Sequence, residues 1–279
     1  MLDILRMDLV RMRKMKTLWI LPLIVIVILF ITAYATHKTY SYATNVQELA
    51  DSLDVELEGA DSATLKSLLE SMGGSTVNPL REYASAVSAN ILPLFLVIFV
   101  VLFANADFSS GFIKTIGGQI KRRSMLLWSK LISLFLYEIL FFAVTFAGHV
   151  ISEAIFFDKL NFANGPDFMR FMCVQFVMYY AVICFSVMVT TVSHSNMLGM
   201  VISLINVLGF FSVIALLLQN AIRAAFEKTV DLRHYLIMDN ITEVRFHTTD
   251  VTKPLIVCGV TAVITIALSM LSLEKRDIV

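Results

Sequence analysis

The sequence predicts an all-α membrane protein with six transmembrane helices. Hydrophobic residues make up 58% of the 279 residues, charged residues make up only 16%, and the mean hydropathy is +0.79. Soluble domains are typically about 45–50% apolar and about 25% charged. The apolar residues also gather in continuous runs, and a bilayer core about 30 Å thick needs about 20 such residues per helix. A helical, multi-pass membrane protein is therefore expected.

Residues 1–17 are predicted to form an interfacial helix ahead of the first span. Leu5, Leu9 and Met12 recur on one helical face, while basic residues lie on the others. Such a helix lies in the headgroup plane before the chain enters the bilayer. A plain basic flank is the alternative.

The transmembrane domain follows over residues 18–279. Its six predicted spans cover residues 18–36, 88–106, 125–149, 168–192, 197–219 and 254–273. Loops on the cytoplasmic side carry an excess of Lys and Arg. These residues gather before the first span, between the second and third spans, and after the sixth span. Both termini are therefore predicted to be cytoplasmic.

Residues 37–87 are predicted to be an acidic insertion on the extracytoplasmic side. Leucines and other apolar residues recur at helical spacing within 46–53 and 65–72, which predicts two short helices. The insertion is either a solvated loop without a partner or a cap that gathers substrate. A charge-balanced outer loop is predicted over 220–253.

The sequence lacks the motifs of several enzyme classes. Gly111 and the pair Gly117 and Gly118 do not have the spacing of a P-loop, and no Lys-Ser or Lys-Thr follows them. The zinc-protease motifs and the G-x-S-x-G motif are also absent. We therefore expect no catalytic residues, no metal site and no cofactor in this chain. Its formal net charge of +0 gives no reason to expect a nucleic-acid partner.

Three residues within the predicted spans are weak candidates for a substrate path. Glu138 lies near the middle of the third span, where a carboxylate is costly and is expected to face the bundle interior or water. Packing, substrate contact and proton coupling are all open for this residue. Asn206 either hydrogen-bonds a neighbouring helix or lines the path, and Phe210 either packs or lines it.

The segment from Asp107 to Lys130 is polar and basic, and it lies between two apolar runs. Within Asp107 to Ser110, the aspartate and the two serines are residue types that cap helix N-termini, and Gly117 with Gly118 are typical of a helix end. A short helix on the cytoplasmic face is therefore predicted. The residues assigned to it and its flanks are Asp107, Ser109, Ser110, Gly111, Phe112, Ile113, Lys114, Gly117 and Gly118. The residues predicted to anchor the next span at the headgroups are Arg122, Arg123, Trp128 and Lys130.

This order of residues resembles the corresponding loop of the ABC transporter type 2 permeases. The matching positions are Asp107, Gly111, Phe112, Lys114, Arg122 or Arg123, and Lys130. Asp107 stands where that family more often has Glu, and Phe112 stands where it has Thr. The resemblance extends over the whole chain in architecture, from the basic N-terminal helix to the short basic tail.

The resemblance implies that residues 109–118 form a coupling helix, which docks into a separate ATPase subunit. Two permease chains, identical or different, would pair with two ATPases that hold ATP and magnesium. Export of an amphipathic peptide, antibiotic or lipid-like substrate from a bacterial cell is the implied function. Membrane lipids are the other expected partners, and the cell membrane is the implied location.

Two other functions stay open. A proton-coupled secondary carrier would use Glu138 to couple proton and substrate movement. A membrane sensor or immunity protein would bind a peptide through the acidic insertion and transport nothing.

Overall fold

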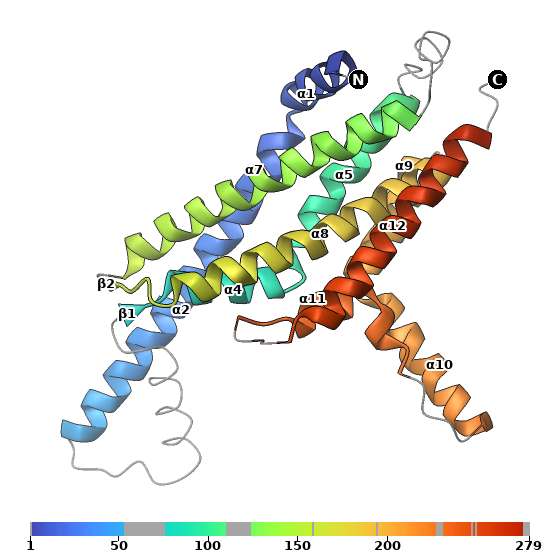
Figure 1. Cartoon of the computed structure of the whole chain (residues 1–279). Helices are drawn as coiled ribbons and strands as arrows, with labels where there is room; N and C mark the ends of the chain where they lie inside the picture. The colour runs from blue at the N-terminus through green and yellow to red at the C-terminus, as the bar shows by residue number, and fades with distance from the viewer. Residues whose placement is uncertain are drawn as a thin grey trace.

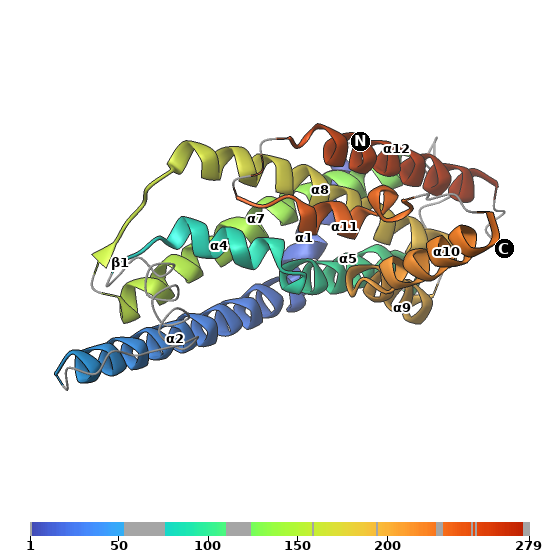
Figure 2. The same cartoon turned by 90° about the horizontal axis from the view of Figure 1, so that it is seen from below.

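The computed structural model describes residues 2–52, 76–109, 124–157, 159–193, 195–226, 231–246, 248 and 250–275. In this part of the chain the structure is mainly α-helical, with one small two-stranded sheet. The long helices lie side by side in an elongated bundle (Figure 1). Helices α2 (Thr17–Ser52) and α12 (Thr252–Lys275) run along opposite sides of it (Figure 2).

Among the described residues, four helices are long and apolar enough to cross a membrane. They are α2, α7 (Ser124–Phe156), α8 (Gly165–Ser193) and α12. Two bent helix pairs meet the same criterion if each pair is taken as one span, which gives up to six spans. The chain is therefore a multi-pass membrane protein, and the prediction of a helical membrane protein is confirmed.

Helix α2 extends well beyond the predicted first span of 18–36. Its apolar part, Thr17–Thr39, has the length and hydropathy of a span, and the helix then continues through polar residues to Ser52. No Pro or Gly interrupts residues 37–52, so nothing in this stretch strongly opposes helix propagation. The residues predicted to form a separate helix at 46–53 therefore belong, as far as Ser52, to the last turns of α2. The predicted helix at 65–72 lies outside the described residues.

The predicted second span, 88–106, is the second part of a bent pair. Helices α4 (Pro79–Ser88) and α5 (Ile91–Ser109) meet at 59°. The Asn78 side chain caps α4 by accepting a hydrogen bond of 3.1 Å from a backbone N–H of the first turn. Pro79 starts the helix, where its missing N–H costs nothing. Charged residues lower the hydropathy of α4 and hide it from a search for apolar runs.

The predicted fifth span, 197–219, is also broken. Helices α9 (Asn196–Val207) and α10 (Phe210–Phe226) form an angle of 64°. Gly209 lies at the break with a φ of +77°, which side chains with a Cβ rarely adopt. Helix α10 projects away from the bundle (Figure 1), and most of its apolar side chains are exposed. Such a surface is suited to lipid or to another protein.

A short helix, α11 (Ile237–Glu243), lies within the region predicted as a loop over 220–253. Its apolar side chains are buried. The Gln175 amide of α8 donates to the carbonyl oxygens of Ile241 at 3.2 Å and Val244 at 3.0 Å. These carbonyls lie at the end of α11, where helical donors are missing. Gln175 therefore attaches α11 to α8.

Two tyrosines hold α4 against the long helices. The Tyr83 hydroxyl lies 2.8 Å from Thr145 Oγ1 of α7, and the Tyr179 hydroxyl of α8 donates to a carbonyl in the last turn of α4 at 2.6 Å. Ahead of α4, strand β1 (Thr76–Val77) pairs in parallel with β2 (Lys159–Leu160), between α7 and α8. The start and the end of α4 are thus both fixed to the bundle.

Helix α1 (Leu2–Lys14) and the last turns of α12 lie at the same end of the bundle (Figure 1). The ends of α5 and α7 that flank residues 110–123 lie there too. We call this the terminal end, and the end that carries the two strands the distal end. Residues 2–14 are helical as predicted, and Met12 packs into the core. The interfacial position of this helix stays a prediction.

Gly148 of α7 sets the distance between α7 and α2. A Cβ at this position would lie 2.5 Å from Cγ1 of Ile26. Small residues commonly let membrane helices approach this closely. Gly148→Leu is expected to lower the free energy of unfolding in detergent by about 1–3 kcal/mol, the usual cost of overpacking. Thermal unfolding of the purified variant measures this.

Gly259→Leu on α12 is the matched control, because no heavy atom lies within 4 Å of a Cβ added there. This variant is expected to unfold within about 0.5 kcal/mol of the natural chain. Equal losses in the two variants would contradict the close packing of α2 and α7 at Gly148.

Candidate functional site

Buried polar contacts join α1, α5 and α7 at the terminal end. The Ser129 hydroxyl of α7 donates to Asp8 Oδ2 of α1 at 2.5 Å. Lys130 Nζ, on the next residue, donates to the Ala104 carbonyl oxygen of α5 at 2.7 Å. All three polar side chains are buried. Charge-assisted hydrogen bonds are the stronger ones, so three helices are held together next to residues 110–123.

Lys130 differs from the predicted headgroup anchor. Its exposed fraction is only 8%, and its amine donates a hydrogen bond to a backbone carbonyl of α5. The long, flexible stem of a lysine allows this reach across to a neighbouring helix. Trp128 is 44% exposed, as an interfacial residue would be, and its anchoring role stays a prediction. Arg122 and Arg123 lie outside the described residues.

Helix α5 continues through Asp107 to Ser109. Asp107 and Ser109 therefore lie in the last turn of α5, and their part in the predicted coupling segment stays a prediction. The remaining residues of the predicted coupling helix lie outside the described part of the chain. They are Ser110, Gly111, Phe112, Ile113, Lys114, Gly117 and Gly118. The described part of this site is the pair of helices from which the segment leaves and into which it returns.

The three candidates for a substrate path lie on different elements. Glu138 of α7 is fully buried, and neither carboxyl oxygen has a hydrogen-bond partner among the described residues. Its burial agrees with a carboxyl group that faces the bundle interior. Asn206 is buried in the last turn of α9, and Phe210 at the start of α10 is 54% exposed. A path that uses all three stays a prediction.

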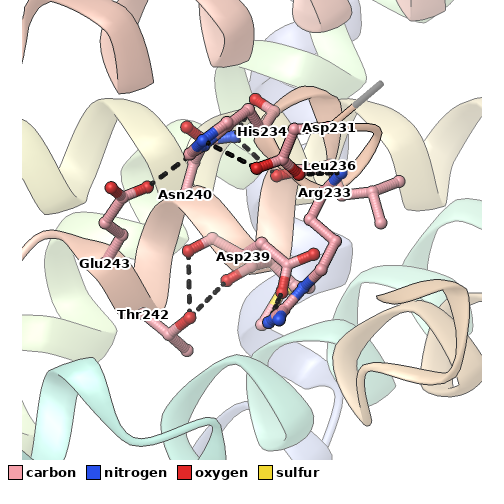
Figure 3. Close-up of polar contacts among 9 residues, drawn as sticks. Asp231, Arg233, His234, Leu236, Asp239, Asn240, Thr242 and Glu243 are labelled. Atoms are coloured by element: carbon pink, nitrogen blue, oxygen red, sulfur yellow. Dashed lines mark hydrogen bonds and ion pairs between the residues drawn. The ribbon is translucent and has the colours of Figure 1, made fainter. Parts of the chain in front are cut away.

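Polar contacts fold the turn η1 (Arg233–Tyr235) against α11 (Figure 3). Arg233 Nη2 donates to Asp239 Oδ1 at 3.1 Å, and His234 Nε2 lies 3.1 Å from Asp231 Oδ2. Exposed ion pairs of this kind contribute only about 0.2–1 kcal/mol each, so the network orients the turn more than it stabilises the fold. Within the described ranges, no group of three or more His, Cys, Asp or Glu residues is arranged to hold a metal ion.

A basic cavity of about 760 Å³ lies between α4 and the segment that follows α11. Arg81 and Arg245 line it, together with the hydroxyl-bearing residues Ser88, Thr242 and Thr248. Both arginines are exposed. The cavity thus combines positive charge with hydroxyl groups, which is the chemistry that binds anionic groups. No sequence motif indicates this cavity, because its residues come from segments far apart in the chain.

A family model described as "Protein of unknown function (DUF2705)" matches residues 63–279. No curated protein matches the chain.

Lys130→Met tests the connection between α5 and α7. Met keeps an unbranched apolar stem but cannot donate to the Ala104 carbonyl oxygen. A hydrogen bond to a charged group contributes about 1.5–3 kcal/mol, and the variant is expected to lose stability of that size. Unfolding of the purified chain in detergent measures the loss.

Lys253→Met is the matched control, because Lys253 is exposed at the start of α12. It is expected to change stability by no more than about 0.5 kcal/mol. If both variants unfold like the natural chain, Lys130 does not hold α5 to α7.

Proposed function

The chain belongs to the DUF2705 family, whose function is unknown, and we propose that it is the membrane permease subunit of an ATP-driven ABC exporter. In this role the chain has no nucleotide site of its own. A separate ATPase subunit binds ATP and magnesium and supplies the free energy. Two permease chains form a dimer that moves the substrate out of the cell by alternating access.

The terminal end faces the cytoplasm in this proposal. Lys and Arg residues precede α2 and lie between α5 and α7, and the positive-inside rule favours the cytoplasm for such segments. Residues 110–123 are then accessible to a soluble ATPase. The distal end, with α4 and the basic cavity, faces the extracytoplasmic side of a bacterial cell membrane.

The observation that carries the proposal is the pair of buried contacts at Ser129 and Lys130. They join α7 to α1 and to α5 at the point where the predicted coupling segment is attached. A force applied to that segment therefore acts on three connected helices. Rigid-body tilting of such a unit is an established way to convert local binding into a larger movement.

The exposed apolar surfaces fit a permease that works as a dimer in lipid. Side chains of α10 and α12 are exposed and apolar along much of their length. Contiguous surfaces of this kind contact lipid, a second chain or an amphipathic substrate. An amphipathic peptide, an antibiotic or a lipid-like molecule is the substrate class we propose.

Phe112→Asp or Ile113→Asp tests the coupling role. A buried charge in an apolar docking contact is costly, so each variant is expected to insert normally but to lose ATPase binding. Transport should fall by at least about 90%, and a tenfold loss corresponds to about 1.4 kcal/mol of free energy. Co-purification of the ATPase and ATP-dependent efflux from cells measure the two effects.

Phe162→Asp is the matched control, because Phe162 is exposed in the connection between α7 and α8, away from the terminal end. It should keep ATPase binding. Full ATPase binding and transport in both Phe112→Asp and Ile113→Asp would contradict the docking role. Transport without any ATPase would favour a carrier that uses Glu138 instead.

A further inference from the structure

A second cavity, of about 200 Å³, lies between α2, α4, the start of α5 and α7, and we call it the acidic cavity. A buried water needs only about 10–15 Å³ of such space, so this cavity has room for a larger group. Glu82 of α4 and both His149 and Glu153 of α7 line it. Thr32 and Thr36 of α2 add hydroxyl groups. The rest of the lining is mainly aliphatic.

Buried polar atoms in this cavity lack partners. His149 is 3% exposed and Glu153 is 2% exposed. Their closest polar atoms, His149 Nε2 and Glu153 Oε1, are 3.8 Å apart, which is too far for a hydrogen bond. Glu153 Oε2 has no hydrogen-bond partner among the described residues. The His149 ring lies beside the Pro79 backbone but forms no hydrogen bond of good geometry with the described residues. Leaving buried polar groups unpaired costs about 1–3 kcal/mol each.

The charge in the cavity is also uncompensated by the described residues that line it. No Lys or Arg is among them. Arg81, beside Glu82 in sequence, lines the basic cavity instead. His37 of α2 packs its ring against Phe156 and Phe157. Arg81 is close enough to act electrostatically on Glu82, but among the described residues no lysine or arginine lines the cavity beside Glu153 and His149.

A primary ammonium group fits this set of acceptors. It has three donors and no acceptor, and carboxylate oxygens and a neutral imidazole nitrogen accept from it. The aliphatic lining suits the alkyl chain that carries the group. A metal ion fits less well, because no three ligand-type residues in the described ranges come together here. We infer that this cavity binds the primary ammonium group of an amphipathic molecule, with the carboxyl groups of Glu82 and Glu153 as its acceptors and His149 beside them.

This inference rests on the proposed permease function, because it names the substrate class. Two sources carry the same chemistry: an amine of a peptide, and the headgroup of an aminophospholipid. In the proposed orientation the cavity lies at the extracytoplasmic end of α7. An ammonium group bound there would belong to a substrate near the end of its export.

Binding of hexylammonium to the full-length chain tests the inference without any transport assay. The chain is placed in phosphatidylcholine nanodiscs, and titration calorimetry is corrected with empty nanodiscs. Hexylammonium is expected to bind the chain, whereas hexanol, which lacks the charge, is not. The double variant E82Q/E153Q should bind hexylammonium about tenfold more weakly or worse, since each change removes a charged acceptor. Glu243→Gln, which neutralises an exposed carboxylate on α11, should bind as the natural chain does.

If E82Q/E153Q does not fold, Ala86→Leu replaces it. Ala86 lines the cavity, so the larger side chain should fill the cavity and weaken binding while both carboxyl groups remain. Equal binding of hexylammonium to the natural chain, E82Q/E153Q and Ala86→Leu would overturn the inference, as would no binding to the natural chain.

Nanodiscs that contain phosphatidylethanolamine distinguish the two sources. If the headgroup of phosphatidylethanolamine competes for the cavity, hexylammonium binds more weakly in these nanodiscs, and the cavity is assigned to an aminolipid headgroup. Unchanged binding assigns the cavity to a peptide amine. Failure of the permease proposal would appear separately, as the absence of an ATPase partner, and it would leave these binding results intact.

Discussion

Backbone carbonyls at helix ends inside an apolar layer must find donors, because no water is present there to satisfy them. Buried side chains supply these donors. The Tyr179 hydroxyl donates to Val87 O in the last turn of α4, and Gln175 donates to carbonyls at the end of α11. Lys130 adds a charged donor to Ala104 O near the end of α5. The two short helices therefore keep fixed positions on α7 and α8, and α5 is held to α7.

Helix α7 links the two ends of the molecule. Lys130 lies near its start, beside α5, and Glu153 lies in its last turn, in the acidic cavity. At 1.5 Å per residue these positions are about 35 Å apart along the helix axis. A tilt of α7 that begins at the terminal end would change the distance between α7 and α4 at the acidic cavity. The proposed ATPase contact and the proposed ammonium site thus share one rigid element.

The spans follow from local hydropathy, and α8 and α12 begin and end close to the predicted boundaries, whereas α7 continues to Phe156, beyond the predicted end at residue 149. Helices α4 and α11 were hidden because polar and charged residues interrupt their apolar spacing, and contacts with α8 bury them only in the folded chain. Spacing alone offers a weak signal for α11, since Ile237 and Ile241 share a helical face. The acidic cavity is beyond sequence reasoning, because Glu82 and Glu153 belong to no motif and meet only through the packing of α4 on α7. The predicted coupling residues lie mostly outside the described part of the chain, so their role rests on the sequence.

The central claim is that a separate ATPase powers this permease. Its most direct test is to purify the tagged chain from its native membrane in a mild detergent, to identify the co-purified proteins by mass spectrometry and to measure ATP hydrolysis. The predicted result is a P-loop ATPase that co-purifies in about equal amount with the tagged chain. Its ATP hydrolysis should require magnesium, and antibodies to the tag should remove this activity from solution. A chain that transports its substrate after purification without any nucleotide-hydrolysing partner would contradict the account.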